Sequence, residues 1–176
     1  MRCSWAGIDP LYVEYHDTEW GVEVRGDNAM FERLSLEGFQ AGLSWITILK
    51  RREGFRSAFH GFQIERVAEM ADFEVDALML DTGIIRNRAK IHSTIRNAQL
   101  CQQLDLTELL WSFAPSSGEG RNSSPRAVSE ESTAMSKALR KLGFGFVGPT
   151  TMHALMQAVG MFNEHHADCF RHSELT

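Results

Sequence analysis

A single acidic residue stands near the start of the stretch LEGFQAGLSWITILKRRE, residues 36–53. This residue, Glu37, is followed eight positions later by Trp45. A carboxylate accepts hydrogen bonds, and the face of an indole ring attracts cations. An acid and an indole so close together are therefore candidates for a binding site. The residue types alone favour a simpler interpretation, in which a hydrogen-bonded buried acid lies beside ordinary core aromatics.

Two pairs of cysteine and histidine near the chain ends are candidates for a metal site. Cys3 and His16 form the first pair, and His165 and Cys169 form the second, at a spacing that predicts one face of a helical turn. Two sulfurs and two imidazoles suit a tetrahedral zinc ion with no position left for water, which indicates a structural role. From spacing alone, ordinary buried or terminal thiols explain the cysteines slightly better. Two further histidines compete for the imidazole positions, His166 and His172.

The stretch KLGFGFVGPTTMHALMQAVG carries the strongest local pattern. A helix is expected to end at Gly143, a short turn holds Gly145 and Gly148, and Pro149 suits the first position of a new helix. This order predicts a helix-hairpin-helix over about residues 132–160, whose glycines and free N–H groups hold a DNA phosphate without reading sequence. Two alternatives remain open. One is a tight turn without a ligand, and the other is a dinucleotide site, which would need a preceding strand.

The elements that must position these residues are predicted to be helices. Apolar residues recur at helical spacing, and no convincing alternating strand pattern appears. The predicted helices begin at capping residues or at an apolar residue, namely Asp27, Ser44, Asp72, Ile84 and Ser129 or Ser132. Gly83 is expected at the C-cap of the helix that follows Asp72. The fold class is therefore predicted to be all-α.

The 176 residues are expected to form a single domain, 1–176, because this length supports one hydrophobic core. The region of about residues 114–128 holds two of the four prolines together with serine, glycine and asparagine, and it is predicted to be a flexible loop. The apolar runs are too short to cross a membrane, and the first residues lack a secretory signal. Three widely spaced cysteines argue against a disulfide framework. We expect a cytoplasmic monomer without a membrane partner.

The net charge of −5 argues mildly against a nucleic-acid partner. Binding to phosphates depends on local clusters, however, and the basic residues do cluster. Solvated helix faces and phosphate contacts explain such clusters about equally well. The first cluster is Lys50, Arg51, Arg52 and Arg56, the second is Arg86, Arg88, Lys90 and Arg96, and the third is Lys137, Arg140 and Lys141.

Four segments together closely resemble the Tag family of 3-methyladenine DNA glycosylases: DPLYVEYHDTEWGV, LEGFQAGLSWITILKRRE, TGIIRNRAKI and GFGFVGPTTMHALMQAVG. The resemblance runs from Cys3 to Cys169. It implies an all-α helix-hairpin-helix glycosylase fold in which a structural zinc ion joins the N- and C-terminal segments. The implied zinc ligands are Cys3, His16, His165 and Cys169, and the implied base pocket consists of Glu37, Tyr12, Tyr15 and Trp45.

The resemblance also implies an activity, the excision of N3-methyladenine from alkylated double-stranded DNA with release of the free base. We expect base flipping, with Gly42 and Leu43 as a wedge, and no lyase step. The simpler alternative for Leu43 is an ordinary core leucine. Glu37, the expected catalytic residue, is interpreted as a reader of the base edge that stabilises charge, rather than as a powerful general base. Two alternatives remain, a non-catalytic helix-hairpin-helix DNA-binding module and a glycosylase with another alkylpurine preference, such as 3-methylguanine.

Overall fold

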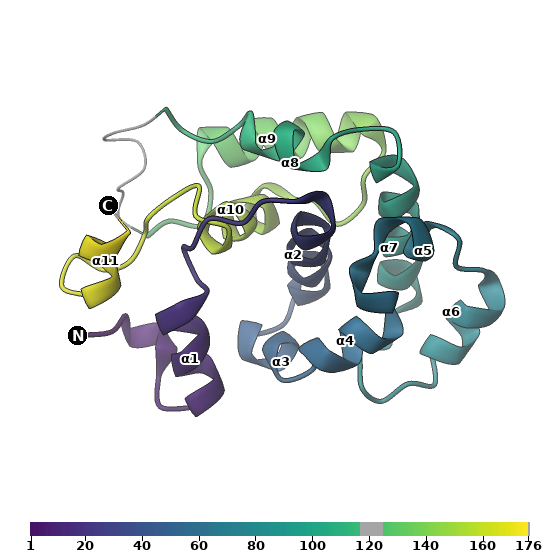
Figure 1. Cartoon of the computed structure of the whole chain (residues 1–176), viewed down its shortest axis with the longest axis horizontal. Helices are drawn as coiled ribbons and strands as arrows, with labels where there is room; N and C mark the ends of the chain where they lie inside the picture. Colours follow the sequence, from purple (N-terminus) through teal and green to yellow (C-terminus); the bar gives the residue numbers. More distant parts are fainter. Residues whose placement is uncertain (117–124, 176) are drawn as a thin grey trace.

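The structure, a computed structural model, describes residues 1–116 and 125–175. The all-α prediction is confirmed, because the described residues form helices and no strands. Residues 117–124 of the predicted loop lie outside the described residues. In chain order the elements are η1 (Ser4–Ala6), α1 (Pro10–Thr18), α2 (Asp27–Gln40), α3 (Trp45–Leu49), α4 (Arg52–Ala58), η2 (His60–Phe62), α5 (Ile64–Ala68), α6 (Asp72–Leu78), α7 (Arg88–Cys101), α8 (Leu106–Trp111), α9 (Glu130–Leu142), α10 (Pro149–Ala158) and α11 (Phe170–Glu174) (Figure 1).

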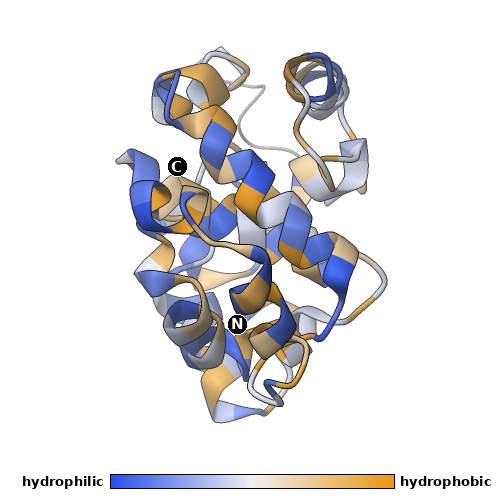
Figure 2. Ribbon diagram, turned by 90° about the vertical axis from the view of Figure 1, so that its right-hand side faces the viewer, coloured by the Kyte–Doolittle hydropathy of each residue, from blue (hydrophilic) through white to orange (hydrophobic). Residues whose placement is uncertain are grey.

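Helix α2 lies at the centre of the fold and packs against α10, α7 and the short helices that follow it (Figure 1). Its Phe39 contacts Phe55 of α4 with ring centroids 4.6 Å apart, and Phe59 and Phe62 stack behind them. Burial of each such ring stabilises the fold by roughly 1.5–3 kcal/mol. Figure 2 shows hydrophobic and hydrophilic residues alternating along the helix ribbons, as expected where one face of each helix covers a core.

Two of the predicted helix-end residues act elsewhere. Asp27 lies inside the first turn of α2, and its carboxylate accepts a 2.9 Å hydrogen bond from the backbone N–H of Thr107, at the start of α8. The prediction for Gly83 is wrong, because α6 ends at Leu78 with Met79 as its C-cap. The backbone of Gly83 instead packs closely against Gly54 in α4, and a Cβ added to Gly54 would collide with the Gly83 carbonyl. Both residues therefore take part in contacts between segments that are far apart in the sequence.

The helix expected after Ser44 is interrupted. Ser44 is the N-cap of α3, but α3 ends at Leu49 and α4 begins at Arg52. The helix expected from Ile84 begins only at Arg88, after the cap Asn87. The backbone therefore turns between α2 and α3 and again before α4, which leaves Gly42 and Leu43 on an exposed turn.

Helices α9 and α10 form the predicted hairpin. Ser129 caps α9, Gly143 ends it in the left-handed region at φ 98°, and Pro149 occupies the first turn of α10. Side chains of α7 hold the turn in place: Asn97 accepts a hydrogen bond from the Gly145 N–H at 2.9 Å and donates one to the Gly145 carbonyl at 3.2 Å. The hairpin is thus attached to the body of the protein through α7.

The two chain ends lie side by side, as Figure 1 shows for the N-terminus and α11. The N–H of Phe170 donates a 3.0 Å hydrogen bond to the carbonyl oxygen of Met1. This contact brings the first residues of the chain against the segment that follows α10. Among the described residues, no helix has the length and apolar character needed to cross a membrane.

Candidate active site and metal centre

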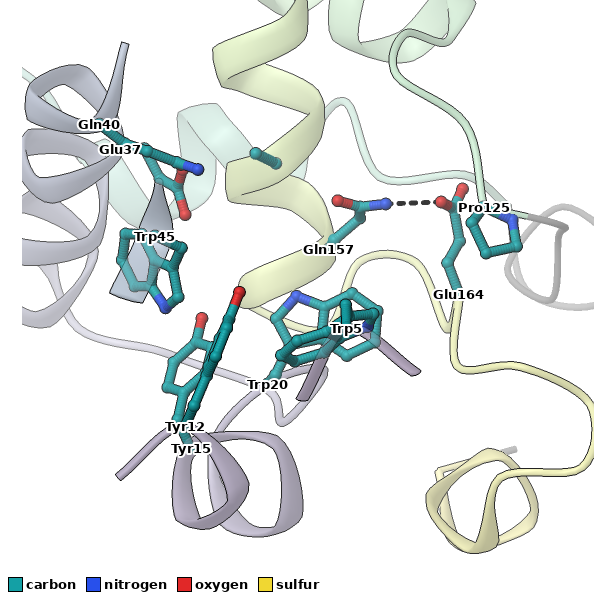
Figure 3. A pocket seen from close by; sticks show the side chains of 11 residues that line it. Trp5, Tyr12, Tyr15, Trp20, Glu37, Gln40, Trp45, Pro125, Gln157 and Glu164 are labelled. Atoms are coloured by element: carbon teal, nitrogen blue, oxygen red, sulfur yellow. Dashed lines mark hydrogen bonds between the residues drawn. The ribbon is translucent and has the colours of Figure 1, made fainter. Parts of the chain in front are cut away.

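A cavity of about 210 Å³ opens between α1, α2, α3 and α10. Glu37, Tyr12, Tyr15 and Trp45, four residues that the sequence placed in one pocket, all line it (Figure 3). Other lining residues were not anticipated, because nothing in their spacing marks them as pocket residues. These are Trp5, Trp20, Gln40, Pro125, Ala154, Gln157 and Glu164.

Among the residues that the structure describes, Glu37 is a buried acid without an ion-pair partner. The residue is only 4% exposed, and no described residue bonds its Oε2 atom. Burial raises the pKa of Glu37 to about 8, and Arg33, one turn earlier on α2, lowers it only in part. The Arg33 guanidinium is already engaged by Glu19 at 2.9 Å. A buried carboxyl oxygen that no described residue bonds is expected if its partner is a ligand.

Aromatic rings form the walls around this acid. The rings of Tyr15 and Trp45 lie 5.4 Å apart and tilted by 45°, and Trp5 lies 5.1 Å from Tyr12 and 4.9 Å from Trp20. The indole N–H of Trp45 is buried and has no hydrogen-bond acceptor among the described residues. The cavity therefore offers π faces to a flat ring, together with one free donor and one free acceptor.

Cys3, His16, His165 and Cys169 come together where the chain ends meet, and all four are buried. Their ligand atoms lie within 4.8 Å of one another. Cys169 Sγ is 3.4 Å from His16 Nε2 and 3.6 Å from His165 Nδ1. Cys3 Sγ is 3.5 Å from the same nitrogen of His165. Sulfur and nitrogen ligands of a tetrahedral zinc ion stand about 3.5 Å apart, so these side chains can hold one ion.

Groups around these ligands fix their orientation. His16 Nδ1 lies 2.8 Å from an oxygen of Asp17, and His165 Nε2 lies 3.2 Å from the Trp20 carbonyl. Carboxylate and carbonyl partners of this kind are typical of metal-binding histidines. Burial lowers the pKa of His165 to about 4 and raises the pKa of the Cys3 thiol to about 11. A neutral imidazole is the ligand form, and a bound dication would favour the thiolate.

The predicted helical turn between His165 and Cys169 is wrong. Residues 161–169 contain no helix, and Cys169 is instead the N-cap of α11. A turn closed by the Cys169 N–H and the His166 carbonyl, 2.8 Å apart, brings the two side chains together. Neither competing histidine, His166 or His172, belongs to the four-residue group.

Comparison with known proteins identifies the family. The sequence model of the methyladenine glycosylases matches residues 5–172. The chain belongs to the methyladenine glycosylase family. A relative from Haemophilus influenzae, named DNA-3-methyladenine glycosylase, is 42% identical over 96% of this chain and 96% of its own. The resemblance found in the sequence is therefore confirmed.

Solved structures of the family share the fold. A crystal structure of a 3-methyladenine DNA glycosylase I matches with a TM-score of 0.91 and 41% identity, covering 97% of this chain and 98% of that one. A structure from Staphylococcus aureus, described as the basis of 3-methyladenine recognition, matches with a TM-score of 0.88 and 33% identity. That match covers 96% of this chain and 95% of its own.

The turn between α2 and α3 of this methyladenine glycosylase exposes Gly42 and Leu43, the two residues that the sequence analysis expects to act as a wedge. Leu43 is 41% exposed, and Gly42 before it adopts φ 83°. A second cavity of about 220 Å³ is lined by both residues and by Thr150 and Thr151 at the start of α10. It shares Glu37 with the aromatic cavity. The exposed turn, the hairpin and the buried acid therefore lie along one continuous surface.

The hairpin uses its two predicted glycines differently. The N–H of Gly145 is already bound by Asn97, and an added Cβ there would collide with Ser93 of α7. Gly145 therefore permits close packing rather than offering a free donor. Gly148 is the N-cap of α10, and its N–H and that of Thr150 have no acceptor among the described residues. These donors at a helix start can face an anion.

Most members of the first two basic clusters are engaged by other groups of the protein. Lys50 pairs with Asp9 at 2.6 Å, Arg52 pairs with Glu19 at 2.6 Å, and Arg88 pairs with Asp76 at 2.7 Å. Lys90 is buried and bonded to backbone carbonyls. These contacts leave few of the predicted cations available to a phosphate.

The third basic cluster is exposed on α9 and adjoins the hairpin turn; it consists of Lys137, Arg140 and Lys141. None of the ion pairs within the described part of the chain involves these three residues. Their charges are therefore available to a phosphate near the start of α10.

Proposed function

We propose that this enzyme hydrolyses the N-glycosidic bond of N3-methyladenine in alkylated DNA and releases the free base. Membership of the methyladenine glycosylase family supports this activity, as does the name of the Haemophilus influenzae relative. The observation that carries the proposal is the unpartnered Oε2 of Glu37 inside a cavity with aromatic walls. A flat cationic base supplies a positive charge for the carboxyl group of Glu37 and a ring that can lie against the aromatic walls.

Recognition follows from the chemistry of the cavity. N3-methyladenine in DNA carries a positive charge, and faces of Tyr15 and Trp45 attract a cation by roughly 0.5–2 kcal/mol. In the empty cavity Glu37 is largely protonated at neutral pH, because burial raises its pKa to about 8. A cationic base favours the carboxylate form, which accepts hydrogen bonds from the exocyclic amine. Ordinary adenine is neutral and gains less from the same contacts.

Catalysis needs little from an acid, because the positive charge already weakens the bond from the base to the sugar. The main contributions of the protein are capture of the flipped nucleotide and stabilisation of charge beside it. Glu37 acts on the base edge in this proposal and need not deprotonate water. Gly42 and Leu43 fill the space that the flipped base leaves in the duplex. Gly148 and the start of α10 bind a backbone phosphate.

A lyase step is not part of the proposal. Such a step uses an amine nucleophile, and no lysine lines the cavity among the described residues. The ammonium of Lys90 is turned away onto the carbonyls of Phe39 and Ala41 at 2.8 Å each. The enzyme is therefore proposed to be a monofunctional hydrolase. That it acts as a monomer in the cytoplasm stays a prediction.

The ion for the four-ligand site is proposed to be zinc, because two thiolates and two imidazoles are its usual structural ligands. With all four positions filled by protein, the ion would supply no open coordination site for a water molecule. Its contribution would be to the fold, by joining the N-terminal segment to the segment before α11.

The test is release of 3-methyladenine from methylated duplex DNA by purified protein. Glu37→Gln should lower kcat/KM by about 10- to 100-fold, because a hydrogen bond to a charged acceptor is lost. Glu32→Gln is the matched control, since Glu32 lies on the same helix but pairs with Arg56 outside the cavity. Wild-type rates in the Glu37 variant would overturn its assigned role. No release by the unmodified protein would favour the non-catalytic DNA-binding module, and preferential release of 3-methylguanine would favour the other glycosylase.

A further inference from the structure

A second buried carboxylate lies beside the aromatic cavity. Glu164 lines the cavity on the side away from Glu37 and is 1% exposed (Figure 3). It stands in the segment between α10 and α11, where the sequence showed only proximity to the metal ligands. The proposed chemistry of base capture does not use it.

The groups that contact the Glu164 carboxyl come from two other segments, α10 and the residues before α9. Gln157 of α10 donates its side-chain N–H to Oε2 at 2.6 Å, and the backbone N–H of Arg126 reaches the same oxygen at 3.2 Å. The guanidinium of Arg126 lies 3.4 Å from Oε1, and His153 Nε2 lies 3.3 Å from it. Every one of these contacts presents a nitrogen to the carboxyl group. The N–H groups of Gln157 and Arg126 make this carboxyl group the acceptor in their contacts.

Glu164 thereby fixes the orientation of the Gln157 side chain. A carboxamide has a donor end and an acceptor end, and its NH₂ must face Glu164. Figure 3 shows the Gln157 nitrogen on the side of Glu164 and its oxygen on the side of Glu37 and Trp45. No described residue donates a hydrogen bond to that oxygen. A fixed acceptor is thus presented to the cavity opposite the acid that the sequence identified.

We propose that Gln157 Oε1 is a specificity-determining acceptor for the exocyclic amine of the flipped base, and that Glu164 is the positioning residue that holds it. The proposal rests on the proposed glycosylase function. An amine at position 6 of the purine donates to this oxygen. A carbonyl at the same position, as in 3-methylguanine, would bring two acceptors together. The amine has two N–H bonds, so Gln157 accepts one while Glu37 accepts the other, and Gln157 adds to the selection of 3-methyladenine over 3-methylguanine.

The decisive measurement is the ratio of kcat/KM for release of 3-methyladenine and of 3-methylguanine from the same methylated duplex. Gln157→Leu keeps the size of the side chain and removes the acceptor. It should lower kcat/KM for 3-methyladenine by about tenfold, the cost of one hydrogen bond, with little loss for 3-methylguanine. Gln99→Leu is the matched control, because Gln99 likewise donates its side-chain N–H from a helix, in its case to the Ala68 carbonyl, but lies outside the cavity. An unchanged ratio in Gln157→Leu would overturn the proposal.

Glu164→Gln tests the positioning role. A neutral amide can donate as well as accept, so Gln157 can turn its NH₂ toward the cavity and the selectivity should fall without a comparable loss for 3-methylguanine. A purely structural role would lower both rates together. Far-UV circular dichroism and metal content establish whether the Glu164→Gln variant is folded. If that variant does not fold, the selectivity of Gln157→Leu tests the proposal. Failure of the unmodified enzyme to release 3-methyladenine would instead refute the proposed function itself.

Discussion

The ammonium of Lys90 donates a 2.8 Å hydrogen bond to the carbonyl oxygen of Ala41, at the end of α2. The same ammonium reaches the Phe39 carbonyl and lies 5.7 Å from the ring centroid of Phe146 in the hairpin turn. Lys90 is 7% exposed, and burial lowers its pKa. One cation on α7 thus connects the turn that carries Leu43 with the hairpin, the two segments proposed to face DNA.

Lys90→Met should weaken DNA binding more than base binding. Loss of the ammonium leaves two carbonyls of α2 without their donor, which should lower the free energy of unfolding by about 1–3 kcal/mol. The loosened turn should reduce affinity for a duplex with an abasic-site analogue, whereas free 3-methyladenine should bind almost unchanged. Fluorescence anisotropy and tryptophan quenching measure the two affinities. Equal losses in both would contradict this role. Lys50→Met is the control for stability, because Lys50 pairs with Asp9 on the surface.

Glu37→Gln should stabilise the protein at alkaline pH. The folded state raises the pKa of Glu37 from 4.5 to about 8, mainly through burial. The folded state therefore binds the proton more tightly than the unfolded chain. The contribution of Glu37 is most favourable below pH 4.5 and is lost progressively as the pH rises through about 8, at up to about 1.4 kcal/mol per pH unit. The variant should match the parent near pH 5 and exceed its melting temperature near pH 8.5. Parallel pH profiles would refute the raised pKa.

The pH dependence of kcat/KM should report the same group in the free enzyme. If the base is captured by the carboxylate form, kcat/KM should rise with pH and level off above about 8. Arg33, Tyr12 and Tyr15 are the other charged or titratable groups around Glu37. Burial raises the pKa of both tyrosines, so they stay neutral over this range. If kcat/KM of the Glu37→Gln variant still rises with pH in the same way, the rise must be caused by the titration of another group.

Cys169→Ser should remove the metal and destabilise the junction of the two chain ends. Cys169 is 2% exposed and contacts both histidines of the group. We expect metal content near zero by atomic absorption and a melting temperature lowered by several degrees or more, because a structural metal contributes directly to folding. Cys101→Ala is the control: it removes a buried cysteine outside the group and should leave metal content unchanged. Full metal occupancy in Cys169→Ser would exclude this ligand.

Leu43→Ala should impair excision from duplex DNA while leaving stability within about 0.5 kcal/mol, as expected for an exposed side chain. Without the leucine side chain, nothing fills the space that the flipped base leaves in the duplex. Because unstacking a base costs a few kcal/mol, kcat/KM on duplex DNA should fall by about tenfold or more. Single-stranded methylated DNA should be affected much less. Leu142→Ala removes another exposed leucine, on α9, and provides the comparison. Equal losses on both substrates would argue against a wedge.

Local sequence signals predicted the helical hairpin well. Pro149 begins α10 and Gly143 ends α9 in the left-handed region because both effects depend on the residue's own backbone. Ser129 likewise caps α9 through an N–H only three residues away. Long motifs also identified Glu37, Trp45 and the tyrosines together, through resemblance to the family. The bare spacing of these residues favoured an ordinary core.

Contacts between segments that are distant in the sequence could not be predicted from local signals. Asp27 has the sequence signature of an N-cap for α2, yet it binds the start of α8, and the first basic cluster is largely engaged in ion pairs such as Arg52 with Glu19. No spacing along the chain reveals a partner that is brought close only by packing.

The sequence by itself determined the all-α class, the hairpin and the residue types of the pocket and metal site, because these depend on local backbone preferences and on long family motifs. Only the tertiary structure decided that no described residue bonds Oε2 of Glu37 and that the Glu164 carboxyl binds the side-chain N–H of Gln157. It also showed that Lys90 joins the two segments proposed to contact DNA. The physical reason is that burial and hydrogen-bond satisfaction arise between residues far apart in the chain, so they exist only once the helices have packed.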